Sequence, residues 1–314
     1  ALGLGIHGAL EGLKYIASAG GHLSAAPPSF GDNNNFGLAL LMCFPVLLYL
    51  YRYSVVKHVR LGLAGGAVLN FVGIMCTNSR GALLGLVAMA TAYILRSRRK
   101  VSGMLALAAV GGLVLVLAPD RWTQRMDTIS NAGQDGSFVG RMVSWKLNTV
   151  MALERPLGGG FSALEDRRVF EAYRPRINTT LTIFPVEMPD IALAAHSIYF
   201  EALGDNGFPG LLLFVSLLFI AFASLRKVRR LTRDHPTLGW AYDLADTMRL
   251  MMIGYTVAGA ALSMAYFELF YITITLISVL RHLVVKEVRA TVPARSPAPM
   301  IGNRALAPAQ TRWL

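Results

Sequence analysis

Two basic side chains, Arg80 and His196, stand where long apolar stretches meet polar sequence, and a third, Arg141, opens an amphipathic stretch. Arg80 lies in the polar residues 77–81, between two apolar runs that leave no room for a true loop, and this predicts a position at a membrane boundary. A guanidinium there can bind phosphate oxygens through two hydrogen bonds and does not deprotonate. An imidazole, whose ordinary pKa is about 6.5, can act as a general base near neutral pH. These residue types suit base-assisted chemistry on an anionic substrate.

Other residues near these three could support the same chemistry. Ser79 adds a hydrogen-bond donor, and Gly158 and Gly160 belong to a glycine run whose backbone can approach a ligand closely. Asp205 follows His196 on one predicted helix, and an acid at such depth needs a partner, for which an arginine is a candidate. Simpler interpretations stay open, because each arginine can contact lipid headgroups and His196 can be a hydrogen-bonded helix cap.

The elements that must position these residues are membrane-spanning helices. Of the 314 residues, 54% are hydrophobic and 15% are charged, whereas a soluble domain carries roughly 25% charged residues. The net charge of +12 could indicate nucleic-acid binding, but the bases alternate with apolar runs close to the roughly 20 residues that cross a bilayer. We therefore expect a membrane protein and no nucleic-acid partner. The predicted spans are residues 36–51, 61–77, 81–95, 101–118, 197–225, 250–265 and 267–285.

The distribution of Lys and Arg predicts the orientation of these spans. Basic residues gather in every second connection, around residues 52–60, 96–100 and 226–249 and after residue 280. By the positive-inside rule these connections face the cytoplasm, which places Arg80 and the long segment 119–196 outside. That segment is too long for a structureless linker, so we expect it to fold, with an amphipathic helix over residues 141–153.

The predicted fold class is all-α, a polytopic transmembrane helix bundle with a large, partly helical outer loop. We expect a disordered tail because the C-terminal residues are rich in Pro and basic residues. Motifs of zinc hydrolases, serine hydrolases and P-loop nucleotide binding are absent from the sequence. The expected segments are a partial helix and outer loop (1–30), transmembrane helices (31–118), the outer loop domain (119–196), transmembrane helices (197–290) and a cytoplasmic tail (291–314).

Several short motifs resemble the bacterial O-antigen ligase/polymerase superfamily in order and spacing, over about residues 30–225. The branch of O-glycosylation ligases associated with the exosortase system is most similar. Two mild departures occur, because the family pattern commonly has Asn at Ser197 and Glu at Asp205. Relatives carry more helices, so we expect N-terminal helices to be missing from this chain. The motifs are Asp32-Asn33-Asn34, Ser79-Arg80-Gly81, Arg141 with Trp145, Pro156 with Gly158 and Gly160, and His196-Ser197 followed by Asp205, Gly207 and Gly210.

The resemblance implies an inner-membrane glycosyltransferase whose outer loop is periplasmic and whose active site faces the periplasm. It would move a glycan from an undecaprenyl-diphosphate carrier to a hydroxyl of lipid A-core or of a protein. Arg80 and Arg141 would bind the diphosphate, and His196 would deprotonate the acceptor, with inversion and without a metal or other cofactor. Supporting roles fall to Ser79, Asp205, Gly158 and Gly160.

Two alternatives stay open beside this interpretation. An O-antigen polymerase of the same superfamily would use the same residues with a second lipid-linked repeat as acceptor. A membrane transporter is the alternative from another class, although the spans show no inverted repeat, and few of them carry charge where transport sites form, near the bilayer midplane.

Overall fold

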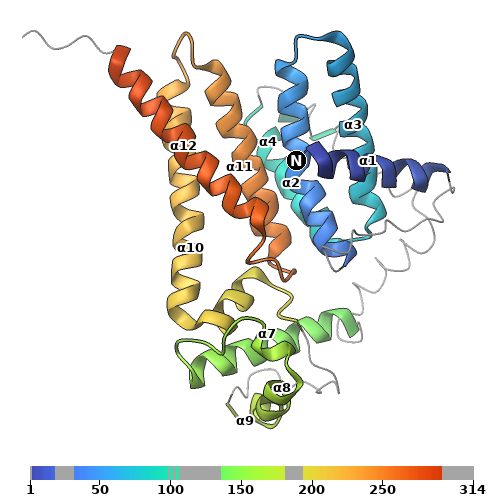
Figure 1. The fold of residues 1–314 in the computed structure, drawn as a ribbon, viewed down its shortest axis with the longest axis vertical. Helices are drawn as coiled ribbons and strands as arrows, with labels where there is room; N and C mark the ends of the chain where they lie inside the picture. Colours follow the sequence, from blue (N-terminus) through green and yellow to red (C-terminus); the bar gives the residue numbers. More distant parts are fainter. Residues whose placement is uncertain are drawn as a thin grey trace, which may run out of the picture.

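A computed structural model describes residues 2–17, 32–97, 100–101, 104–105, 136–180 and 194–291. The described residues are 83% helical and contain no strand, so the predicted all-α polytopic bundle is confirmed. Figure 1 shows a group of upright helices above a smaller lower group of helices. Within the described ranges, the helices that are long and apolar enough to cross a membrane are α2 (Asn33–Tyr53), α3 (Lys57–Cys76), α10 (Ile198–Thr232) and α12 (Glu268–Thr291).

Two further helices complete the upright group, and one of them corrects the sequence prediction. Helix α4 (Arg80–Ile94) matches the span expected at 81–95, but the span expected at 250–265 is wrong at both ends. The helix there, α11, covers Gly239–Gly259, and residues 260–267 form turns before α12. The span expected at 101–118 lies almost wholly outside the described residues, as do most of the tail and parts of the loop domain.

Helix α11 begins earlier than expected because its charged residues are paired. Asp243 forms an ion pair with Arg52 of α2 at 3.1 Å, and Asp246 forms one with Arg249 of α11 itself at 3.0 Å. Paired charges lower the cost of placing polar side chains in a packed helix. The sequence alone suggested a polar connection at this place.

Helix α11 lies at the centre of the bundle and packs against α2, α4, α10 and α12. Its contact with α4 uses small residues, since a Cβ added to Gly85 would lie 3.0 Å from the Cβ of Ala258. Small residues let membrane helices approach closely. Near the α12 side, Tyr255 stacks on Phe270 with ring centroids 4.4 Å apart. These contacts hold the last turn of α11 beside the first turn of α4, where Arg80 stands.

The lower group in Figure 1 has a small hydrophobic core of its own. Helix α7 (Gly136–Glu154) contains the helix expected over residues 141–153 and packs against α10. At the N-terminus, α1 (Leu2–Ala17) packs against α3 and α2. The remaining short helices are α8 (Arg167–Tyr173) and α9 (Ile177–Thr180), with the 3-10 turns Ala163–Glu165 and Arg174–Arg176.

Candidate functional site

The three candidate residues converge on the connection between α11 and α12, residues 260–267, which we call the α11–α12 turn. Arg141 donates from Nε to the carbonyl of Ala261 at 3.4 Å, and the backbone N–H of His196 donates to Ser263 Oγ at 2.6 Å. Arg80 begins α4, whose next residue, Gly81, packs against the last turn of α11. Figure 1 shows this turn at the lower end of α11, above α7. Three residues that are far apart in sequence therefore lie at one end of the bundle, here called the site end.

Arg80 is placed by a tight polar connection between α3 and α4. Asn78 has a left-handed backbone with φ of 51°, and Ser79 is the N-cap of α4, its Oγ accepting from the backbone N–H of Ala82 at 3.2 Å. A serine cap satisfies one of the free N–H groups of a helix start. Ser79 is buried, so its hydroxyl positions the half-buried Arg80. The hydroxyl expected to act as an additional donor thus serves as an acceptor for the start of α4.

Trp145 holds Arg141 and His196 in fixed relative positions. It lies one turn after Arg141 on α7, and its Nε1 donates to the carbonyl of His196 at 3.3 Å. Its ring stacks on Phe200 of α10, with centroids 5.3 Å apart. The sequence motif contained Trp145, but only the tertiary contacts show that it binds the backbone of His196 and stacks on Phe200.

His196 lies just before α10 in a backbone conformation that is uncommon for histidine. Its φ is +49°, in the left-handed region, and the N-cap of α10 is the next residue, Ser197. His196 is therefore not itself the N-cap residue of α10. Because Ser263 and Trp145 bind the N–H and the carbonyl of His196, its backbone is fixed and the imidazole direction is restricted.

The surroundings of His196 favour its neutral form. Burial lowers the pKa of the imidazole from its ordinary 6.5, and the positive charge of Arg141 lowers it further. The carboxylates of Asp32 and Glu165 act in the opposite direction. Asp32 is itself the N-cap of α2, accepting from the backbone N–H of Asn35 at 2.8 Å. A neutral imidazole can accept a proton, as a general base requires.

The glycine run is explained by a break in α10 rather than by a ligand. Helix α10 is interrupted at Gly207, where φ is 64° and ψ is −162°. The backbone of Pro156 accepts from Phe208 N–H at 3.0 Å, and Gly160 N–H donates to the carbonyl of Asp205 at 2.9 Å. A Cβ on Gly158 would lie 2.3 Å from that same carbonyl oxygen. The close approach expected for Gly158 and Gly160 is therefore an approach to α10.

Asp205 links three parts of the site end. Its carboxylate accepts from the backbone N–H of Ser162 and from the hydroxyl of Tyr266, each at 3.1 Å. Within the described residues no arginine pairs with Asp205, so the arginine suggested as a partner is replaced by these donors. Burial raises the pKa of Tyr266 and the Asp205 charge raises it further, so the hydroxyl stays protonated and can donate. Nearby, Glu201 accepts from the backbone N–H of Ala265 at 2.8 Å.

The α11–α12 turn is the part of the site that the sequence interpretation missed. None of its residues was among the candidates chosen from the sequence, yet its Ala261, Ser263 and Ala265 all bind residues of the site end. The available signal was the pair of polar residues Ser263 and Tyr266 between two apolar runs. No group of His, Cys, Asp or Glu suited to hold a metal ion occurs in the described ranges.

Replacing Gly158 by alanine should destabilise the site end strongly. The new Cβ would collide with the Asp205 carbonyl, and φ at Gly158 is +86°, so we expect a loss of about 3 kcal/mol or more. Gly160 is a matched control, because its φ is +98° but a Cβ there meets open space. Its replacement by alanine should cost only about 1–2 kcal/mol of backbone strain. Thermal unfolding in detergent measures both, and equal losses would contradict the docking of this segment on α10.

The matched family covers all three candidate residues. Residues 65–215 match the model of a protein family described as O-Antigen ligase. No curated protein matches the chain.

Proposed function

From its place in the O-antigen ligase-like superfamily, to which residues 65–215 assign it, we propose that this chain is an inner-membrane glycosyltransferase. It moves a glycan from an undecaprenyl-diphosphate carrier to an acceptor hydroxyl of lipid A-core or of a protein. The observation that carries the proposal is the convergence of Arg141 and His196 on the α11–α12 turn, beside the helix start that carries Arg80.

The two arginines bind the leaving group in this proposal. As the bond between the anomeric carbon and the phosphate oxygen breaks, negative charge develops on the lipid diphosphate. Guanidinium groups that are fixed by helix starts and backbone contacts stabilise this charge without reorganising. Arg80 stands at the first position of α4 and Arg141 near the start of α7, so both are held by rigid elements at the site end.

His196 acts on the acceptor. Its neutral imidazole takes the proton of the acceptor hydroxyl while that oxygen attacks the anomeric carbon from the side opposite the diphosphate. The new glycosidic bond therefore forms with inversion, and undecaprenyl diphosphate leaves. The lowered pKa of His196 keeps the base unprotonated at neutral pH.

The alternation of basic connections supports a periplasmic position for the site. Arg52 lies in the last turn of α2 and Arg96 just after α4, at the ends that lie away from the site, and Arg229 lies in the last turns of α10 at the same end. By the positive-inside rule that basic end faces the cytoplasm, so the site end faces the periplasm. Lipid-linked glycans would reach the site end from the outer leaflet.

The experiment is a transfer assay with the protein in proteoliposomes that contain a radiolabelled undecaprenyl-diphosphate glycan. Lipid A-core, a hydroxyl-rich peptide and a second lipid-linked glycan are supplied separately as acceptors. We expect label on lipid A-core or on the peptide, together with released undecaprenyl diphosphate. Label on the second lipid-linked glycan alone would indicate a polymerase. Movement of a tracer across the membrane without any transfer would indicate a transporter and contradict the proposal.

A further inference from the structure

A pocket lies at the basic end of the bundle, far from the candidate site. It has a volume of about 420 Å³ and lies between the end of α4, the last turns of α10, and α11. No acidic side chain lines it. Six cationic side chains do: Arg96, Arg226, Lys227, Arg229, Arg230 and Arg249. We call it the basic pocket.

The charge in the basic pocket is only partly neutralised by the protein. One carboxylate oxygen of Asp246 serves three guanidinium groups, those of Arg96 at 3.3 Å, Arg229 at 3.3 Å and Arg249 at 3.0 Å. Nothing in the described part of the chain forms an ion pair with the other three cations of the pocket. Six positive charges therefore share one carboxylate, which is not among the residues that line the pocket.

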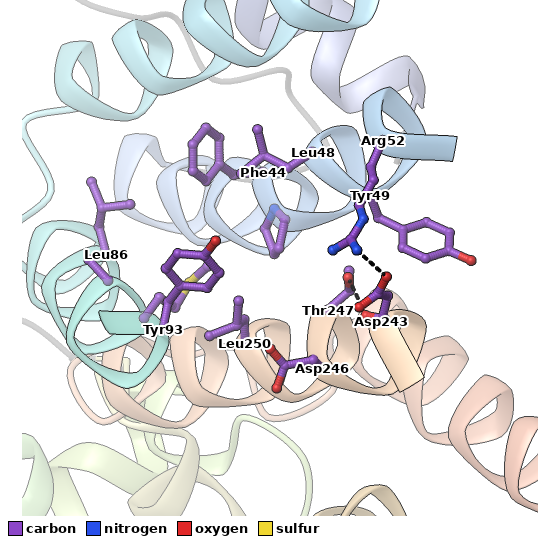
Figure 2. Close-up of a pocket in the computed structure, with 13 residues that line it drawn as sticks. Phe44, Leu48, Tyr49, Arg52, Leu86, Tyr93, Asp243, Asp246, Thr247 and Leu250 are labelled. Carbon is purple, nitrogen blue, oxygen red and sulfur yellow. Dashed lines mark hydrogen bonds and ion pairs between the residues drawn. The ribbon is translucent and has the colours of Figure 1, made fainter. Parts of the chain in front are cut away.

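The neighbouring pocket shows that this imbalance is particular to one side of Asp246. Figure 2 shows that pocket between α2, α4 and α11, where Arg52 points to Asp243 and forms the ion pair drawn there. Tyr53 also donates to Asp243, at 2.7 Å. Two acids, Asp243 and Asp246, line this pocket together with one arginine. The positive-inside rule alone would place basic residues around both pockets. Among the described residues that line the two pockets, the cations without an ion pair instead lie in the basic pocket.

The floor of the basic pocket is apolar and continues the membrane-facing surface. Phe219 and Phe222 line it one to two turns before the basic residues of α10, Ile253 of α11 lines it as well, and Phe219 is 74% exposed. A ligand that fits must carry negative charge at the membrane surface and hydrocarbon below it. Free anions in solution would match the cations but leave the apolar floor uncovered.

We propose that the basic pocket binds an anionic phospholipid of the cytoplasmic leaflet, with headgroup phosphates on the α10 cations and an acyl chain along Phe219 and Phe222. Basic pockets between membrane helices on the cytoplasmic side are suited to phospholipid headgroups. The six cations favour a headgroup with more than one phosphate, as in cardiolipin. This site is separate from the proposed transfer chemistry, and its test does not depend on that activity.

Native mass spectrometry of the detergent-solubilised protein with added cardiolipin tests the proposal. The variant Lys227→Gln/Arg230→Gln removes two pocket cations but leaves the three that bind Asp246. We expect it to bind the first cardiolipin about 30-fold more weakly, since each surface cation contributes about 1 kcal/mol. Phosphatidylethanolamine and inorganic diphosphate should not compete with cardiolipin for the wild-type protein.

The variant Lys286→Gln/Arg289→Gln is the matched control, because it removes one Lys and one Arg with the same spacing from the exposed last turns of α12. Its affinity for cardiolipin should fall at most a few-fold. Equal losses in both double variants would show general surface attraction and overturn the proposal. Competition by inorganic diphosphate at the same concentration would also overturn it, since the pocket would then bind a soluble anion.

Discussion

Replacing His196 by alanine should abolish glycan transfer while the protein still inserts into the membrane. The acceptor hydroxyl would lose its general base, and positioned bases contribute about 10²–10⁴-fold to rate. The rate of label transfer from the lipid-diphosphate donor in proteoliposomes measures the effect. Full transfer by this variant would rule out the role that we give to His196.

The backbone at His196 calls for a second variant. Its φ of +49° is costly for alanine, so His196→Ala could lower the rate through strain. Asparagine tolerates the left-handed region better and has no base of suitable pKa. His196→Asn should therefore unfold at close to the wild-type temperature and still fail in transfer. His282→Ala, on an exposed part of α12, controls for general loss of imidazole.

The pH profile of transfer tests the same residue without removing it. Because a base acts in its neutral form and the pKa of His196 is lowered, the rate should stay high below pH 6.5 and fall only on further acidification. Arg141→Gln removes a positive charge that lowers this pKa, so the acid limb of the residual activity should shift upward. If the rate of the Arg141→Gln variant fell at the same acidic pH as that of the wild-type protein, protonation of His196 would not control the rate.

Helix ends near the candidate site could be predicted because their local signals are strong. The spans predicted to start at residues 81 and 197 each differ by one residue from the observed starts of α4 at Arg80 and of α10 at Ile198. Helix α11 could not be predicted from local hydropathy, since Asp243 and Asp246 look like loop residues until their arginine partners are known. Ion pairs between helices are tertiary facts that a single sequence window does not contain.

The residue types of the site were predictable, but their arrangement was not. Arg80, Arg141 and His196 could be chosen from charge and position alone, whereas the turn that joins them became visible only through contacts with Ser263 and Ala261. The glycine run at residues 158–160 shows likewise that contacts cannot be read from residue types. A glycine that permits close approach does not indicate what approaches, and at Gly158 it is the α10 backbone.

Arg141→Lys should lose most of its transfer activity even though the charge is kept. Lysine presents a single ammonium group and cannot hold two phosphate oxygens with a planar fork. Loss of one fixed donor to a developing negative charge costs about 10²–10³-fold in kcat. We expect kcat to fall by nearly this factor in Arg141→Lys and by the full factor in Arg80→Ala. In both variants kcat should change more than the KM for the donor. Initial rates over a range of donor concentrations separate the two constants.

The matched control for the arginines is Arg167→Lys in the same lower group of helices. Arg167 is exposed and pairs with Glu171 at 3.1 Å, and such surface pairs contribute little. Its transfer rate should stay near wild type. If Arg141→Lys kept the full kcat and raised only the KM, the guanidinium would serve donor binding and not the departure of the diphosphate. An interaction that is equally strong in the ground state and the transition state leaves kcat unchanged. Comparing the effects on kcat and on KM therefore distinguishes an arginine that stabilises the departing diphosphate from one that only binds the donor.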